Sequence, residues 1–250
     1  QSAVAYGNGY QNGYLGKDLS NTGVGLKWDF IIIHESAHEW FGNSISAADI
    51  ADMWIHESFT AYAESVYVEC EFGRKEAINY LFGLRNIILN DKPIIGDYGV
   101  NQEGSGDMYY KGSNMLNTLR SVIGNDTKWW DLLKTFHTKF KYQTIHTDDV
   151  IRFFNERTQL NIKPIFDQYL KYSSIPELEI KLENDELLMK WNTDVDNFRM
   201  PIEYQNASEG ISLKTVVGNE WQLIDLELNS IEELAINKFG YYIKVRSYNP

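Results

Sequence analysis

Two histidines and a glutamate form the pattern with the clearest chemical meaning in this sequence. His34, Glu35 and His38 lie in the segment HESAH, within a run whose apolar residues recur at helical spacing. At 3.6 residues per turn, a step of four residues brings the second imidazole to within about 40° of the first, one turn along the same face. Two neutral imidazoles so placed can bind one Zn²⁺ ion, and Glu35, about 100° around the helix, can reach a metal-bound water molecule. The pattern therefore predicts a hydrolytic zinc site.

The alternative is a chance occurrence, because a helix with two surface histidines shows the same pattern. A catalytic zinc ion has three protein ligands and one open position. Glu57 follows His38 by 19 residues, in a second segment of helical character, and offers a third ligand. The isoleucines at positions 31–33 and Trp40 flank the histidines, so we expect the helix that carries them to be held in a core.

Three sequence blocks resemble the gluzincin aminopeptidases of the aminopeptidase N family. HESAHEWFGN (residues 34–43) resembles the family's HExxHxWFGN block, and DMWIHESFTA (52–61) resembles its D-x-W-L-N-E-G-F-A block. YYKG (109–112) resembles its Y-E-K-G block. The second block departs from the pattern at His56, where Asn is usual, and at Ser58, where Gly is usual. Neither departure alters a candidate ligand.

The resemblance implies a metallopeptidase centre with one Zn²⁺ ion. The ligands would be His34, His38 and Glu57, and Glu35 would be the catalytic carboxylate. The resemblance also implies that Tyr109 stabilises the tetrahedral intermediate, because a phenolic O–H aimed at the developing oxyanion shares its charge with the metal.

Three further residues near these blocks have alternative interpretations. Glu64 lies two turns after Glu57 on the same helix face and matches an acidic position of the family. It either orients a zinc-binding histidine by accepting its second ring N–H or is an ordinary solvated glutamate. Tyr110 lies on the next helix face, and we expect it to be structural. For Tyr109 itself, one tyrosine among sixteen, core packing is the alternative role.

The first 172 residues are mostly helical by their apolar periodicity. The pattern predicts a short strand at residues 3–6 and then helices at 28–41, 53–70, 74–90, 108–123, 128–141, 148–159 and 164–172. Thr147 is the expected N-cap of the sixth helix. Together with the resemblance, this pattern predicts a mainly α, thermolysin-like catalytic domain over residues 1–172.

After residue 172 the apolar period drops to two. The segment SSIP at 173–176 indicates a linker, and short alternating runs follow at 178–182, 187–191, 202–204, 211–217, 221–226 and 241–245. Six or seven strands in so short a segment predict a small antiparallel β-sandwich domain over residues 173–250.

Composition excludes several classes of protein. The chain has 23 Lys and Arg residues against 35 Asp and Glu residues, a net charge of −12, and no basic run, so we expect no nucleic-acid partner. No apolar stretch is long enough to span a membrane. The single cysteine, Cys70, lies in an apolar run, and we expect it to be a buried structural thiol.

The family's amine-binding motif does not occur in this chain. Its members carry a G-x-M-E-N strand before the histidine block, and the glutamate of that strand binds the free α-amine of the substrate. We therefore expect a fragment that lacks this strand and the N-terminal β domain, which would be a partner of the chain. Localisation stays open, although the resemblance favours an extracytoplasmic or membrane-associated protein.

The expected function is a zinc aminopeptidase that removes N-terminal residues from peptide substrates by attack of metal-activated water. Two alternatives remain open. The chain would be a zinc endopeptidase if no group binds the substrate's amine, or a non-catalytic, zinc-stabilised module that binds peptides. Retention of Glu35 and Tyr109 speaks against the module, because holding a metal requires neither residue.

Overall fold

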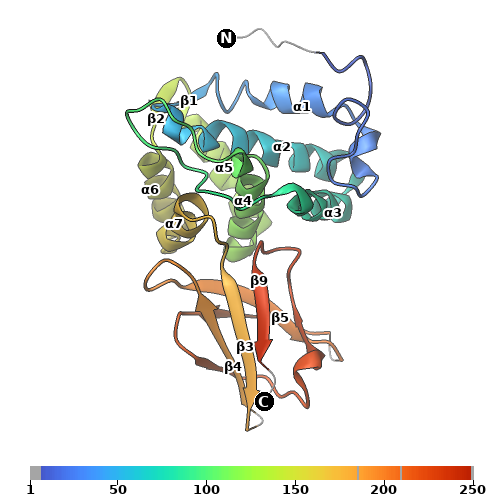
Figure 1. Ribbon diagram of the computed structural model, residues 1–250, viewed down its shortest axis with the longest axis vertical. Coiled ribbons are helices and arrows are strands. Elements are labelled where there is room, and N and C mark those ends of the chain that lie inside the picture. Colours follow the sequence, from blue (N-terminus) through green and yellow to red (C-terminus); the bar gives the residue numbers. More distant parts are fainter. Residues whose placement is uncertain (1–6, 185, 209, 249–250) are drawn as a thin grey trace.

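The chain forms a helical part followed by a β part, as Figure 1 shows for the computed structural model. The structure describes residues 7–184, 186–208 and 210–248. The strand expected at residues 3–6 lies outside the described residues. No described helix combines the length and apolar character needed to cross a lipid bilayer.

The predicted helical segments are all present, with shifted ends. The helices are α1 (Phe30–Ala37), α2 (Trp54–Phe72), α3 (Arg74–Leu84), α4 (Tyr110–Ile123), α5 (Asp126–Phe140), α6 (Thr147–Thr158) and α7 (Lys163–Lys171). The fold class predicted from the sequence, a mainly α part followed by a small β part, is confirmed.

The helix that carries the two histidines, α1, is shorter than expected. The side chain of Asp29 caps its start by accepting from the Ile32 amide. Its end is a turn in which the amides of Trp40 and Phe41 both bond the Ala37 carbonyl. Ile32 and Trp40 are 47% and 53% exposed, so the expectation that these flanking residues are held in a core is wrong for both. One face of α1 packs on α2 and the other faces outward (Figure 1).

The central helix of the fold is α4, where all but one of the residues from Lys111 to Val122 are buried. It packs against α2, α3, α5 and α7 and also contacts β5 (Met200–Asn206). A close approach between α2 and α4 depends on Gly112, because a Cβ atom there would lie 1.8 Å from the hydroxyl of Ser58. The first turn of α4 is thus fixed against α2.

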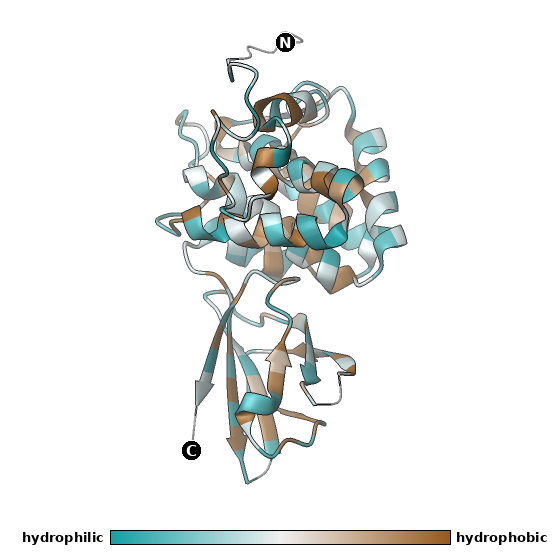
Figure 2. Ribbon diagram, turned by 90° about the vertical axis from the view of Figure 1, so that its right-hand side faces the viewer, coloured by the Kyte–Doolittle hydropathy of each residue, from teal (hydrophilic) through white to brown (hydrophobic). Residues whose placement is uncertain are grey.

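The β part consists of two sheets. One has the strand order β7-β4-β3-β9, formed by Gln222–Ile224, Glu186–Asn192, Glu177–Glu183 and Lys244–Tyr248. The other has the order β6-β5-β8, formed by Ser212–Val217, Met200–Asn206 and Leu234–Ile236. Buried and partly exposed residues alternate along β5, and Figure 2 shows the matching alternation of hydropathy along the strands.

One strand pair departs from the predicted antiparallel pattern. β9 pairs with β3 in parallel, with Leu178 opposite Val245. Both strands start at the junction with the helical part, where the Lys244 amide bonds the Pro176 carbonyl, and so they run in the same direction (Figure 1). Two further features were missed: strand β8, and a parallel pair of β1 (Ile45–Ala47) with β2 (Gln143–Ile145) in the helical part.

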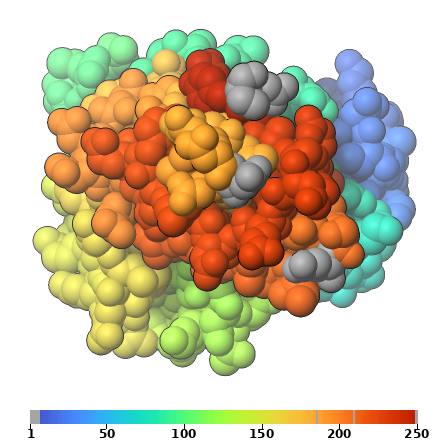
Figure 3. All heavy atoms as spheres, turned by 90° about the horizontal axis from the view of Figure 1, so that it is seen from below, coloured from blue at the N-terminus to red at the C-terminus, as the bar shows by residue number. Residues whose placement is uncertain are grey.

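Hydrophobic packing continues from the helical part into the β part. One cluster of buried residues includes Trp54 and Leu119 of the helices together with Ile180 and Met200 of the strands. Seen from below, the β part covers the middle of the helical part, which remains visible around it (Figure 3). The division into two domains at residues 172 and 173 remains a prediction.

Cys70 and Thr147 differ from their expected roles. Cys70 is exposed, because it lies about 200° around α2 from the buried Val68. The N-cap of α6 is His146 rather than Thr147. The hydroxyl of Thr147 is instead engaged with Trp54 and with the buried carboxylate of Asp52.

Candidate active site

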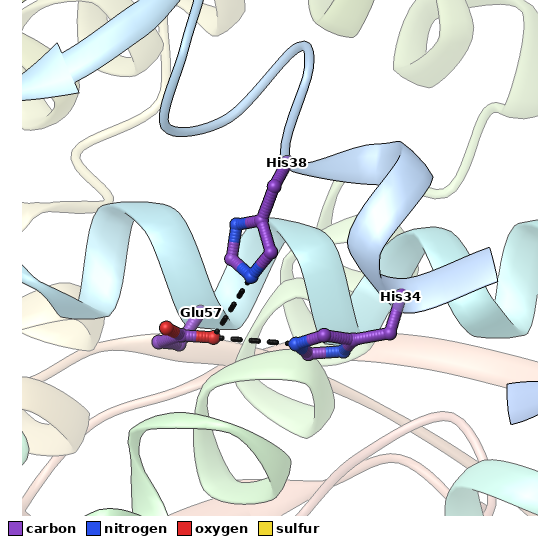
Figure 4. A group of neighbouring side chains, drawn as sticks. All are labelled: His34, His38 and Glu57. Carbon is purple, nitrogen blue, oxygen red and sulfur yellow. Dashed lines mark ion pairs between the residues drawn. The ribbon is translucent and has the colours of Figure 1, made fainter. Parts of the chain in front are cut away.

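Three side chains from α1 and α2 converge where the two helices meet (Figure 4). His34 lies in the second turn of α1, His38 is the residue that follows its last turn, and Glu57 lies in the first turn of α2. Glu57 Oε2 lies 3.4 Å from His34 Nε2 and 3.5 Å from His38 Nε2. The spacing seen in the sequence therefore brings all three candidate ligands together.

The donor set fits a tetrahedral zinc ion. At metal–ligand distances of about 2.0–2.1 Å, tetrahedral ligand atoms lie about 3.3–3.4 Å from one another. The two measured distances from Glu57 Oε2 agree closely with that spacing. This oxygen is also buried and has no hydrogen-bond partner among the described residues, which is costly for a carboxylate unless a cation lies beside it.

Both imidazoles present their Nε2 atoms to this position because their Nδ1 atoms are engaged elsewhere. His34 Nδ1 lies 2.7 Å from Glu64 Oε1. His38 Nδ1 lies 3.0 Å from the Phe41 carbonyl oxygen and 3.3 Å from Thr60 Oγ1. A carbonyl oxygen and a carboxylate accept hydrogen bonds, so each Nδ1 can donate its hydrogen to them, and Nε2 is the atom that would face a metal ion.

The electrostatics of the group favour a positive charge at its centre. Burial disfavours a charged imidazole, yet the bonds to Glu57 and Glu64 outweigh it and raise the pKa of His34 to about 10. Burial likewise disfavours a charged Glu57, but the two histidines lower its pKa to about 2. A divalent cation bound between the two Nε2 atoms would interact with the Glu57 carboxylate in place of a proton on the imidazoles.

Glu64 is buried completely. One carboxylate oxygen contacts His34 Nδ1, and the other accepts a hydrogen bond of 2.8 Å from the hydroxyl of Tyr80. The interpretation of Glu64 as a solvated glutamate is therefore wrong. Burial raises its pKa, and the bonds from His34 and Tyr80 act in the opposite direction.

Tyr109 lies beside the same group, and Glu35 directly follows His34 in α1. Tyr109 is the residue before α4, and its ring stacks on His34 with ring centroids 5.8 Å apart. Burial raises the pKa of Tyr109, and the charges of Glu57, Glu103 and Glu35 raise it further, so its phenol stays protonated near neutral pH. Glu35 is half-buried. The structure thus brings Tyr109 and Glu64 to the three candidate ligands, while Glu35 is placed only by its position after His34 in α1.

Several residues that support this site have no counterpart in the sequence analysis. Tyr80 of α3, the Phe41 carbonyl group and Thr60 each contact a candidate ligand or Glu64, which is bonded to one. Thr60 lies within residues 52–61, the second of the three blocks that resemble the family, and could have been noticed there. Nothing in the sequence around Tyr80 singles it out, because its role depends on how α3 packs against α2.

The comparisons with known proteins all match this chain to peptidases. A family model for the Peptidase family M1 domain matches residues 17–169, more than half of the chain. Human aminopeptidase B is 24% identical over 234 residues, which cover 85% of this chain and 33% of that protein. Aminopeptidase N of Lactococcus lactis subsp. lactis is 25% identical over 173 residues, covering 64% of this chain and 20% of that protein.

A solved structure shares the fold. Legionella pneumophila aminopeptidase A, crystallised in complex with aspartic acid, superimposes with a TM-score of 0.61 at 16% identity. The match covers 92% of this chain and 28% of the other. The chain thus spans about a third, or less, of the length of the proteins it matches.

Proposed function

Because the chain belongs to peptidase family M1, we propose that it is a zinc-dependent metallo-aminopeptidase that releases N-terminal residues from peptides. The observation that carries this proposal is the position of Glu57 Oε2, which is buried between the Nε2 atoms of two histidines and makes no hydrogen bond. The chain spans only part of its relatives, so the activity of the whole protein is part of the proposal.

The residues of the proposed metal centre divide into ligands and supports. His34, His38 and Glu57 would hold one zinc ion, and Glu64 would hold His34 in the required tautomer. When bound, zinc would act as a Lewis acid on the scissile carbonyl group and lower the pKa of attacking water.

Glu35 and Tyr109 carry the proposed chemistry of the chain itself. The carboxylate of Glu35 accepts the proton of the attacking water and delivers it to the leaving amine. The O–H of Tyr109, kept protonated by its raised pKa, donates a hydrogen bond to the oxyanion of the tetrahedral intermediate. The charge that develops in the transition state is therefore met by a donor already in place.

The experiment that tests this function uses the zinc-loaded chain and paired substrates. A panel of amino acid p-nitroanilides with free α-amines is compared with the same panel after N-acetylation and with an internally cleavable peptide blocked at both ends. We expect hydrolysis of the free amines alone, with about one zinc ion per chain by mass spectrometry. Cleavage of the blocked peptide would instead support an endopeptidase, and bound zinc without any turnover would support a peptide-binding module.

A further inference from the structure

A single hydrogen bond joins the helix of Glu57 to the residue before Tyr109. Ser58 is fully buried, and its hydroxyl donates to the Met108 carbonyl oxygen at 2.7 Å. Ser58 directly follows the candidate ligand Glu57, and Met108 directly precedes Tyr109. The bond therefore links the residue after a candidate ligand to the residue before the phenol.

The backbone around Tyr109 needs such a restraint. Tyr109 lies between a 3₁₀ turn (Gly106–Met108) and α4, and its own amide makes only a long hydrogen bond of 3.4 Å to the Gly106 carbonyl. The acceptor of Ser58 belongs to the peptide group that carries the Tyr109 nitrogen. Fixing that peptide plane limits rotation of the Tyr109 backbone and hence the position of its ring over His34.

The space beside Gly112 accommodates the hydroxyl group of Ser58. Gly112 lies opposite, and a Cβ atom at that position would meet the Ser58 hydroxyl at 1.8 Å. A side chain at 112 would thus exclude the hydroxyl, whereas glycine leaves room for it. Ser58 also stands where the related sequence block has Gly, so the bond belongs to this chain rather than to the block as a whole.

The first turn of α4 has a second, independent anchor. The buried ammonium group of Lys111 donates to the carbonyl oxygens of Tyr172 and Ser173, both at 2.8 Å. These bonds hold the turn from the side of the β part. Loss of the Ser58 hydroxyl should therefore loosen Tyr109 without unfolding α4.

We infer that Ser58 is a positioning residue for the proposed reaction, acting through the Met108 carbonyl group to hold the Tyr109 phenol over the metal group. This inference rests on the proposed function. Because the phenol would act on the oxyanion and not on the bound substrate, Ser58 should affect turnover more than substrate binding.

The kinetic test compares Ser58→Ala and Ser58→Gly with Ser65→Ala. Ser65 lies on the same helix, is buried, and donates to the Tyr62 carbonyl group at 2.7 Å, so it controls for loss of a buried serine hydroxyl. For each Ser58 variant we expect kcat to fall about tenfold, with KM and zinc content within twofold of wild type. Ser65→Ala should leave kcat within twofold. An equal loss in both serine variants would overturn the inference.

The effects of Ser58→Ala and Tyr109→Phe on kcat, measured singly and together, distinguish a positioning role of Ser58 from a general structural effect. In a Tyr109→Phe background, Ser58→Ala should lower kcat by less than twofold, since the phenol that it positions is gone. A full tenfold further loss would contradict the inference. Unfolding of both Ser58 variants would also overturn it, because the residue would then be purely structural.

A second readout does not depend on activity. With 3-fluorotyrosine incorporated at position 109, Ser58→Ala should shift or broaden its ¹⁹F resonance, and Ser65→Ala should not. An unmoved resonance would overturn the role of Ser58 even if the chain is a peptidase. A moved resonance in a zinc-loaded chain that hydrolyses nothing would refute the proposed function and keep the structural link.

Discussion

The two ends of the helical part differ in how completely they are covered. At the end formed by α1, the apolar side chains of Ile32 and Trp40 are about half exposed, and the metal group lies directly beneath that helix. At the opposite end, Asn117 and Thr118 of α4 are fully buried against the β part. The candidate metal ligands lie at the open end, and the sealed end joins the helical part to the β part.

The sealed end is built from side chains that satisfy backbone groups of the β part. Asn117 donates to the Phe239 and Gly240 carbonyl oxygens, and the Thr118 hydroxyl accepts from the Tyr242 amide at 2.9 Å. Arg85 adds a bond to the Lys238 carbonyl group. At the open end the side chains of His34, His38 and Glu57 converge on one another, and Glu57 Oε2 is buried without a hydrogen bond. The side chains of the sealed end thus join the helical part to the β part, and those of the open end form a group suited to bind a cation.

The comparison leads to a simple expectation for mutants. Substitutions in the metal group should change zinc binding and turnover with little loss of stability. Substitutions at the junction should change stability and leave the chemistry intact.

The largest effect is expected from Glu57→Ala. It removes the oxygen that lies 3.4 and 3.5 Å from the two histidine nitrogens, so zinc affinity should fall by more than the roughly 10–100-fold typical of losing a supporting residue. Competition with a chromophoric chelator measures the affinity. Zinc binding equal to that of wild type would show that the metal lies elsewhere.

Tyr109→Phe should lower kcat by about 10²–10³-fold, because it deletes one oxyanion donor and keeps the ring that stacks on His34. Steady-state kinetics provide the measurement, with KM and zinc content expected to stay within twofold. Tyr110→Phe is the matched control, since it removes the same hydroxyl from the adjacent residue. Equal losses in both variants would assign the effect to packing.

Glu64→Gln should weaken zinc binding by about 10–100-fold, because a neutral amide oxygen accepts the N–H of His34 more weakly than a carboxylate does. Glu179→Gln is the control, a buried glutamate of the β part paired with Lys190. If chelator competition shows the same change in the two variants, Glu64 has no specific role at the metal.

Thr118→Val should lower the free energy of unfolding by about 1–3 kcal/mol, because the isosteric side chain leaves the buried Tyr242 amide without its acceptor. Urea denaturation measures this change, and zinc content and kcat should be unaffected. Thr138→Val is the control, an exposed threonine that makes a comparable bond to its own helix. A loss of activity in Thr118→Val would break the division of roles between the two ends.

Much of the fold could be predicted because its signals are local. The helical periods of α2 and α4 and the alternation along β3 follow from side chains that are close in sequence, and the structure has elements at those places. The predictions that were wrong concern features that depend on contacts between distant parts of the chain. The parallel pairing of β9 follows from where the chain returns to the junction, and Thr147 is drawn from the cap by the buried Asp52.

The candidate site divides in the same way. The spacing of His34, His38 and Glu57 could be read directly, because helical geometry places the two histidines together and three ligands are what zinc requires. The support by Tyr80 and the Ser58 bond to Met108 arise from packing of α2 against α3 and α4, on which sequence spacing carries no information. Their roles at the site, like those of the ligands, remain predictions.

The most direct test of the central claim measures both the zinc content and the kcat of the Glu35→Gln variant. Glu35 directly follows His34 in α1 and is not one of the three candidate ligands. The account predicts zinc at the wild-type level of about one ion per chain, with kcat lowered by about 10²–10⁴-fold or more through loss of the general base. Hydrolysis at an unchanged rate would contradict the proposed mechanism, whatever the metal content.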